Sequence, residues 1–101
     1  MTFTTEFKQR VFDTLQFNPY LLPCMEALEA NNPNRFRLYI DLALDEIKKG
    51  MEPRMLLDDG DRMLWNGIVT QYFAVSKLYT EFMEMYNMEL DSRNLKSVRN
   101  G

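Results

Sequence analysis

The feature that most constrains the fold of this chain is a stretch without proline from Arg62 to Leu90. Large apolar side chains recur in it at intervals of three and four residues, which is the spacing of one face of an α-helix. They are Trp65, Ile68, Tyr72, Val75, Tyr79, Phe82 and Tyr86. A helix of about 28 residues would be roughly 42 Å long. The sequence therefore predicts one long helix with a continuous apolar stripe, which we call the aromatic seam.

The aromatic seam could pack against other helices or stack nucleic-acid bases. Stacking surfaces place Lys and Arg residues between the aromatic side chains. Lys77 is the only such residue between positions 65 and 90. We therefore expect the seam to face a protein core.

Capping signals and apolar spacing predict shorter helices before the long one. The first should begin at Thr4 or the next residue and run to about Gln16. Asn18, followed by a proline, has the form of a second helix start. Because Pro23 would interrupt the hydrogen bonding of that helix, we expect it to be bent or to restart over residues 23–31.

A third helix is predicted after Asn32, which is also followed by a proline. Its inner face should consist of Phe36, Ile40, Ala43, Leu44 and Ile47. Gly50 is placed to end this helix as the first residue beyond it. A short helical turn is expected from Pro53 to Leu57.

These elements predict an all-α fold, a small helical bundle of three shorter helices and one long C-terminal helix. Residues 1–90 would form a single domain, and residues 91–101 a short, basic, flexible tail. No apolar run approaches the roughly 18 residues of a membrane span, so we expect a cytoplasmic protein without a membrane contact. Cys24, the only cysteine, is expected to be a small buried apolar residue.

An acidic cluster precedes the long helix in the stretch MLLDDGDRMLW. A calcium-binding EF-hand loop needs acidic ligands at alternate positions before its glycine and a glutamate at its end. With Gly60 as that glycine, Met55 and Leu57 would occupy ligand positions and Asn66 the last one. The cluster is therefore expected to cap the long helix rather than to bind a metal. Its members are Asp58, Asp59 and Asp61.

Catalysis is not expected from this sequence. The chain has no histidine, which is the commonest general base and metal ligand. It also has no glycine-rich phosphate loop and no spacing typical of a metal site or nucleophile. We therefore predict a protein that is not an enzyme and has no cofactor.

Three apolar residues near the end of the long helix lie off the aromatic seam, so this part of the helix is apolar on nearly every side. They are Leu78, Met85 and Met88. Either a partner covers them or the N-terminal helix of the same chain does. We expect a partner, which could be a second copy in a homo-oligomer or another protein.

The sequence thus favours a non-catalytic protein-binding module, such as a small inhibitor or adaptor that occupies a partner surface. Helical proteins of this size and composition are common among phage accessory proteins, which is only a compositional association. The alternative is a nucleic-acid or nucleotide binder. Its candidate contacts are Arg35, Arg37, Arg54, Arg93, Lys96 and Arg99.

Overall fold

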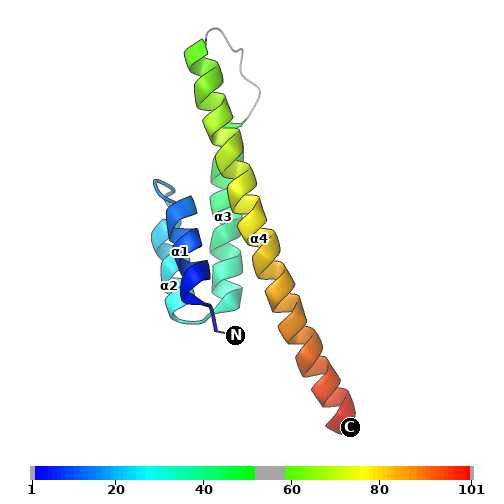
Figure 1. Ribbon diagram of the computed structural model, residues 1–101. Coiled ribbons are helices and arrows are strands. Elements are labelled where there is room, and N and C mark those ends of the chain that lie inside the picture. Colours follow the sequence, from blue (N-terminus) through cyan, green and yellow to red (C-terminus); the bar gives the residue numbers. More distant parts are fainter. Residues whose placement is uncertain (1, 52–58, 101) are drawn as a thin grey trace.

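The structure, a computed structural model, describes residues 2–51 and 59–100, without the side chains of Asp59, Asp61 and 93–100. Its described residues form four helices. These are α1 (Thr5–Thr14), α2 (Leu21–Glu29), α3 (Pro33–Gly50) and α4 (Asp59–Asn100). Figure 1 shows them running alternately up and down, with the long α4 crossing the front of α3. The predicted all-α helical bundle is confirmed.

The four helices surround one core, because α1 packs against α2 and α4, and α3 also packs against α2 and α4. Helix α4 runs antiparallel to α3. The hydroxyl of Tyr86 donates a hydrogen bond of 2.9 Å to Asn34 at the start of α3. At the other end of α3, Ile68 lies beside Gly50. The part of α4 that α3 covers is therefore residues 68–86, which is most of the aromatic seam.

Phenylalanine rings from three elements meet in the core. Phe82 of α4 stacks on Phe3 before α1 and meets the ring of Phe36 from α3 edge to face, with ring centroids 5.0 Å apart in the second pair. Val75 and Phe82 of the aromatic seam are fully buried. The expected inner face of α3 is buried too, except that Leu44 is only partly covered. The prediction that the seam faces the core is confirmed from Ile68 to Tyr86, whereas Trp65 is not among the residues that pack against the core.

Helix α1 begins as predicted, since the hydroxyl of Thr4 accepts a hydrogen bond from the Phe7 amide. The prediction for the second helix is wrong at its start. Asn18 uses its side-chain oxygen to accept a bond of 2.9 Å from the Tyr20 amide, which closes a turn, and α2 begins at Leu21. Pro23 consequently lies in the first turn, where a backbone amide needs no partner within the helix, so α2 neither bends nor restarts there.

Two asparagines connect α2 to α3, and the second of them, Asn32, caps α3 as the sequence predicted. Asn31 has a left-handed φ of 51° and its amide bonds to Leu28, while the Asn32 amide bonds to Ala27. This pair of bonds is the Schellman motif, in which asparagine tolerates the left-handed residue. The side chain of Asn32 then accepts a bond from the Arg35 amide at the start of α3.

Gly50 does not end α3 in the predicted way. It is the last residue of the helix, and none of the described glycines has a positive φ. Met51, with a right-handed conformation, ends the helix instead. The predicted turn from Pro53 to Leu57 lies outside the described residues. So do Asp58 and the other acidic side chains, and their capping role stays a prediction.

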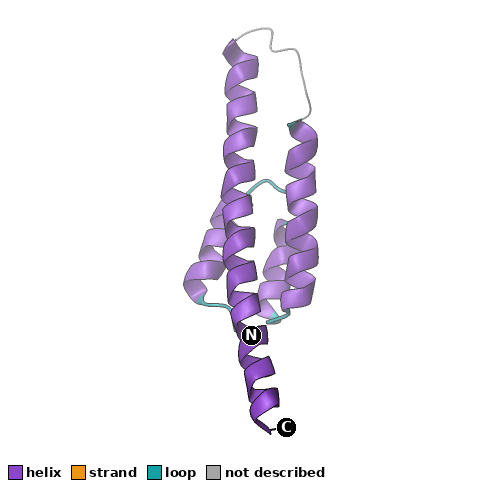
Figure 2. Cartoon of the chain, turned by 90° about the vertical axis from the view of Figure 1, so that its right-hand side faces the viewer, coloured by secondary structure: helices purple, strands orange, loops and turns teal. Residues whose placement is uncertain are grey.

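Helix α4 is longer than the sequence predicted. It ends at Asn100 rather than near Leu90, so residues 91–100, which belong to the expected tail, continue the helix. Figure 2 shows both ends of α4 reaching beyond the other helices. The radius of gyration is 16.8 Å, against about 13 Å for a compact chain of this length. Among the described residues, no helix combines the length and apolarity needed to cross a membrane.

Candidate functional site

The three residues predicted to contact a partner lie in different environments. Leu78 is only 4% exposed and belongs to the core of its own chain. Met85 is half-buried and packs against that core. Met88 is 72% exposed. Leu78 is therefore covered within its own chain and Met85 is partly covered, whereas Met88 is largely exposed, and the predicted partner contact of the three stays a prediction.

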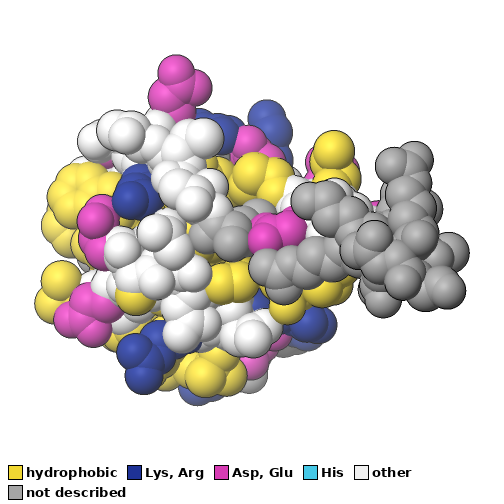
Figure 3. All heavy atoms as spheres, turned by 90° about the horizontal axis from the view of Figure 1, so that it is seen from below, with side chains coloured by type: hydrophobic (Ala, Val, Ile, Leu, Met, Phe, Trp, Pro, Cys, Tyr) yellow, Lys and Arg dark blue, Asp and Glu magenta, His cyan; other side chains and the backbone are white. Residues whose placement is uncertain are grey.

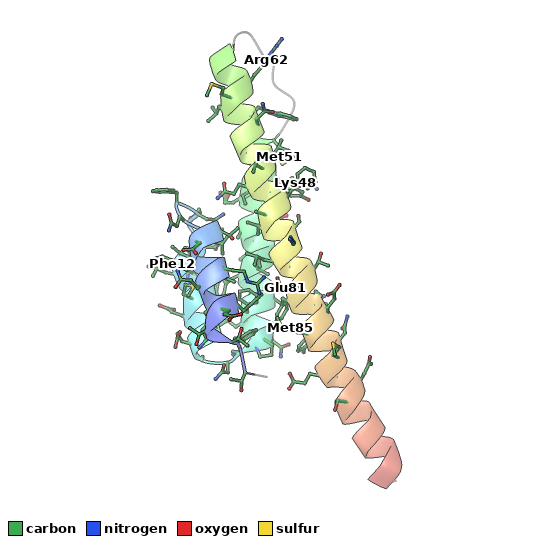
Figure 4. All side chains as sticks on the ribbon, in the orientation of Figure 1. Phe12, Lys48, Met51, Arg62, Glu81 and Met85 are labelled. Carbon is green, nitrogen blue, oxygen red and sulfur yellow. The ribbon has the colours of Figure 1, made fainter. Side chains whose placement is uncertain are left out.

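Helix α1 accounts for the burial of Leu78 and Met85. Glu81 lies between them on the same side of α4, and its carboxylate accepts two hydrogen bonds from Arg10 of α1, the longer at 2.7 Å. Figure 4 shows Glu81 and Met85 one above the other on the side of α4 that faces α1. The hydrogen bonds to Glu81 raise the pKa of Arg10 above its ordinary value. The N-terminal helix thus covers this side of α4, which was the alternative left open by the sequence.

The basic residues of the alternative function are only partly described. Arg35 and Arg37 are exposed near the start of α3. They are two positions apart, so they project from different sides of the helix. Figure 3, which looks at this lower end, shows dark blue basic side chains scattered among magenta acidic ones. Arg54 and the side chains of Arg93, Lys96 and Arg99 lie outside the description, so their nucleic-acid contacts stay a prediction.

A different surface has the shape of a binding site. A hollow of about 330 Å³ lies where the loop between α1 and α2 meets the end of α3 and the flank of α4. We call it the shoulder pocket. Its lining includes Phe17, Pro19, Ile47, Gly50, Ile68 and Gln71. This volume is at the lower end of ligand sites and suits one or two side chains of a partner.

Phe17 at the rim of the shoulder pocket has an unusual combination of backbone and exposure. Its φ is 70°, in the left-handed region, which costs a residue with a Cβ about 1–2 kcal/mol. Its side chain is 101% exposed, so no packing in its own chain offsets that cost. Within residues 2–51 and 59–100, the other left-handed residue is Asn31, a type that tolerates this conformation. Phe17 is therefore held in a costly conformation that presents an aromatic ring to solvent.

Hydrogen bonds fix the loop that carries Phe17. The Asn18 amide donates to the Leu15 carbonyl at 3.0 Å, which closes the turn around Phe17. The side-chain nitrogen of Asn18 donates to the Ala43 carbonyl of α3 at 3.4 Å. The Leu21 amide in turn donates to the Asn18 carbonyl. These bonds connect the loop to α2 and α3, so they fix the backbone position from which the Phe17 side chain projects.

The projecting end of α4 adds apolar surface above the shoulder pocket. Leu64 lies one helical turn before Ile68, on the same side of α4, and is 59% exposed. Met63, its neighbour, is 75% exposed. Helix α3 ends level with Ile68, so it does not cover either residue. Leu64 thus continues the side of α4 that carries Ile68 beyond the shoulder pocket, and Met63 adds a second exposed apolar side chain at this end of α4.

The described residues offer little to a reaction or a metal. Within them, no polar or charged side chain is buried, and no group of three or more Cys, Asp or Glu residues could hold a metal ion. Glu46, which lines the shoulder pocket, forms an ion pair with Lys49 on its own helix, with 3.5 Å between Oε2 of Glu46 and Nζ of Lys49. The arrangement suits the burial of an apolar side chain more than proton transfer or ligation.

No protein-family model, curated protein or solved structure matches this chain. The site must therefore be interpreted from its own geometry.

Proposed function

We propose that this chain is a non-catalytic protein-binding module that uses the shoulder pocket and its rim. The observation that carries the proposal is Phe17, a fully exposed ring on a left-handed residue. A strained backbone conformation that gains no packing within the fold is often retained because it serves a function. Aromatic side chains are also enriched among the residues that dominate the energy of protein interfaces.

The partner should present one or two apolar side chains that enter the shoulder pocket while its surface covers Phe17. Met63 and Leu64 would extend the contact along α4. Methionine adapts its shape to different neighbours, which favours such a role. This chain would act by covering that surface of its partner, as an inhibitor or an adaptor does.

A capture experiment with matched variants tests the proposal. The full chain is immobilised as wild type, Phe17→Asn and Leu38→Asn, and proteins retained from cells that produce it naturally are quantified by mass spectrometry. Leu38 is a suitable control because it is an exposed apolar residue of α3 that does not line the shoulder pocket. We expect at least one protein to be retained by wild type and Leu38→Asn but lost from Phe17→Asn. Equal retention by all three would exclude the shoulder as the binding surface.

A further inference from the structure

The side of α4 that faces away from the bundle is exposed over its middle part. At intervals of three and four residues it presents Thr70, Phe73, Lys77, Thr80, Glu84 and, one turn further, Met88, and each of them is exposed. We call this the outer face. Phe73 is 66% exposed although it is one of the largest apolar residues of the chain. The outer face is opposite the aromatic seam, so no other helix of the bundle packs on it.

Two pairs of residues on the outer face share one midpoint. Lys77 and Glu84, which have opposite charges, are centred on the peptide bond between Thr80 and Glu81. Phe73 and Met88, the large apolar residues on either side of them, are centred on the same bond. A two-fold axis between two antiparallel α4 helices, level with this bond, would therefore place each residue of a pair beside the other member of that pair in the second copy.

We propose that a second copy of this chain packs on the outer face, with the two α4 helices antiparallel. Phe73 of one copy then contacts Met88 of the other, and Lys77 forms an ion pair with Glu84 of the other. The two-fold axis repeats both contacts, as in the isologous interfaces of most dimers. Lys77 and Glu84 have no ion-pair partner among the described residues, so both are free to form these bridges.

Charge determines the orientation. Parallel helices in register would place Lys77 beside Lys77 and Glu84 beside Glu84, and like charges in contact are unfavourable. The antiparallel arrangement replaces these repulsions by two attractions. Glu81, close to the axis, is already neutralised by Arg10 and adds no repulsion of its own. Because each half of the contact buries only one apolar pair, we expect a dissociation constant in the micromolar range.

This dimer goes beyond the proposed function, since it uses the opposite side of α4 from the shoulder pocket. It also revises the expected homo-oligomer contact. Met88 remains a contact residue between the two copies. Leu78 and Met85 do not, and Phe73, Lys77 and Glu84 take their place.

Sedimentation equilibrium of the full chain and three charge variants tests the proposal. Wild type should be a monomer–dimer equilibrium of the 12.0 kDa chain. Lys77→Glu and Glu84→Lys should each weaken dimerisation about tenfold or more, because both bridges become repulsions. The double variant that carries both changes should dimerise like wild type, because its bridges are restored with exchanged charges. Circular dichroism should show the same helicity for all four proteins, since both side chains are exposed.

The outcomes separate the alternatives. A wild-type monomer at about 200 µM would overturn the proposal. A dimer that the single variants leave unchanged, or that the double variant fails to restore, would overturn the antiparallel contact. As a second variant that does not depend on charge, Phe73→Glu should abolish the dimer without unfolding the chain, and Leu38→Glu should leave it intact. Partner capture through Phe17 should persist in Phe73→Glu, so this inference and the proposed function can fail separately.

Discussion

Phe17 is the residue at which stability and function should oppose each other. Its left-handed backbone is unfavourable for phenylalanine, and its exposed ring contributes no packing. Phe17→Asn should therefore raise the free energy of unfolding by about 1 kcal/mol, because asparagine tolerates this conformation. Urea denaturation monitored by circular dichroism measures the change. A loss of stability would mean that the ring packs within its own chain.

Phe17 could not be identified from the sequence, although its neighbours gave a partial signal. The Asn-Pro pair after it predicts the start of a second helix, which in the structure begins three residues after Asn18. Asn18 instead closes a turn with its side chain, and a polar residue before a proline can do either. The sign of φ at Phe17 follows from that choice and has no signature in the residue itself.

Cys24 should be chemically inert in the folded chain. Burial raises the pKa of its thiol to about 12, from an ordinary value of 9.0. Since the thiolate is the reactive form, alkylation by iodoacetamide at pH 8 should be at least about a hundredfold slower in the native chain than in denaturant. Mass spectrometry of timed samples measures both rates.

The pH dependence of stability at Cys24 has a definite sign. The thiol loses its proton more readily when the chain unfolds, so its contribution to folding declines as the pH rises from about 9 towards 12. In the alkylation experiment, similar rates for the native chain and for the chain in denaturant would show that the Cys24 thiol is accessible in the folded state.

At the scale of the helices, Gly50 distinguishes the observed end of α3 from the predicted one. In the structure it is helical, and an added Cβ would lie 3.5 Å from the Cδ1 atom of Ile68, an ordinary contact. Gly50→Ala should therefore stabilise the chain by about 0.5–1 kcal/mol through helix propensity. A left-handed glycine beyond the helix, as the sequence suggested, would instead make alanine unfavourable. Thermal unfolding gives the sign of the change directly.

Two phenylalanines of α4 provide a matched test of its two sides. Phe82 is fully buried among Phe3, Phe36 and Tyr86, whereas Phe73 is largely exposed. Phe82→Ala should lower the free energy of unfolding by about 3–5 kcal/mol. Phe73→Ala should lower it by less than about 0.5 kcal/mol in the monomer. Urea titrations at a low, monomeric concentration measure both. Comparable losses would contradict the assignment of the aromatic seam to the core.

The aromatic seam predicted which side of α4 is covered better than it predicted the length of α4. The seam ends at Tyr86, which lies beside Asn34 at the start of α3, and the next position in its spacing is Glu89. Apolar spacing thus reports where a helix is covered. A helix can continue beyond that point without a packing partner, so its end at Asn100 could not be inferred from the seam.

At the scale of the whole molecule, the arrangement of the four helices decided which apolar residues stay exposed. The sequence revealed that Leu78 and Met85 lie off the seam, but it could not reveal that α1 covers this side of α4. That contact joins Arg10 to Glu81, residues far apart in the chain, and no local pattern encodes it. The same arrangement leaves the shoulder pocket open, because its lining comes from the α1–α2 loop, α3 and α4 together.

Site-specific photo-crosslinking at position 17 tests the central claim, a protein contact at the shoulder pocket, most directly. Phe17 is replaced by benzoylphenylalanine, which keeps an aromatic ring there, and cells that produce the protein naturally are irradiated. We predict a discrete adduct between this chain and a different protein, absent when the same group replaces Leu38. No adduct from position 17, or the same set of adducts from both positions, would contradict the account.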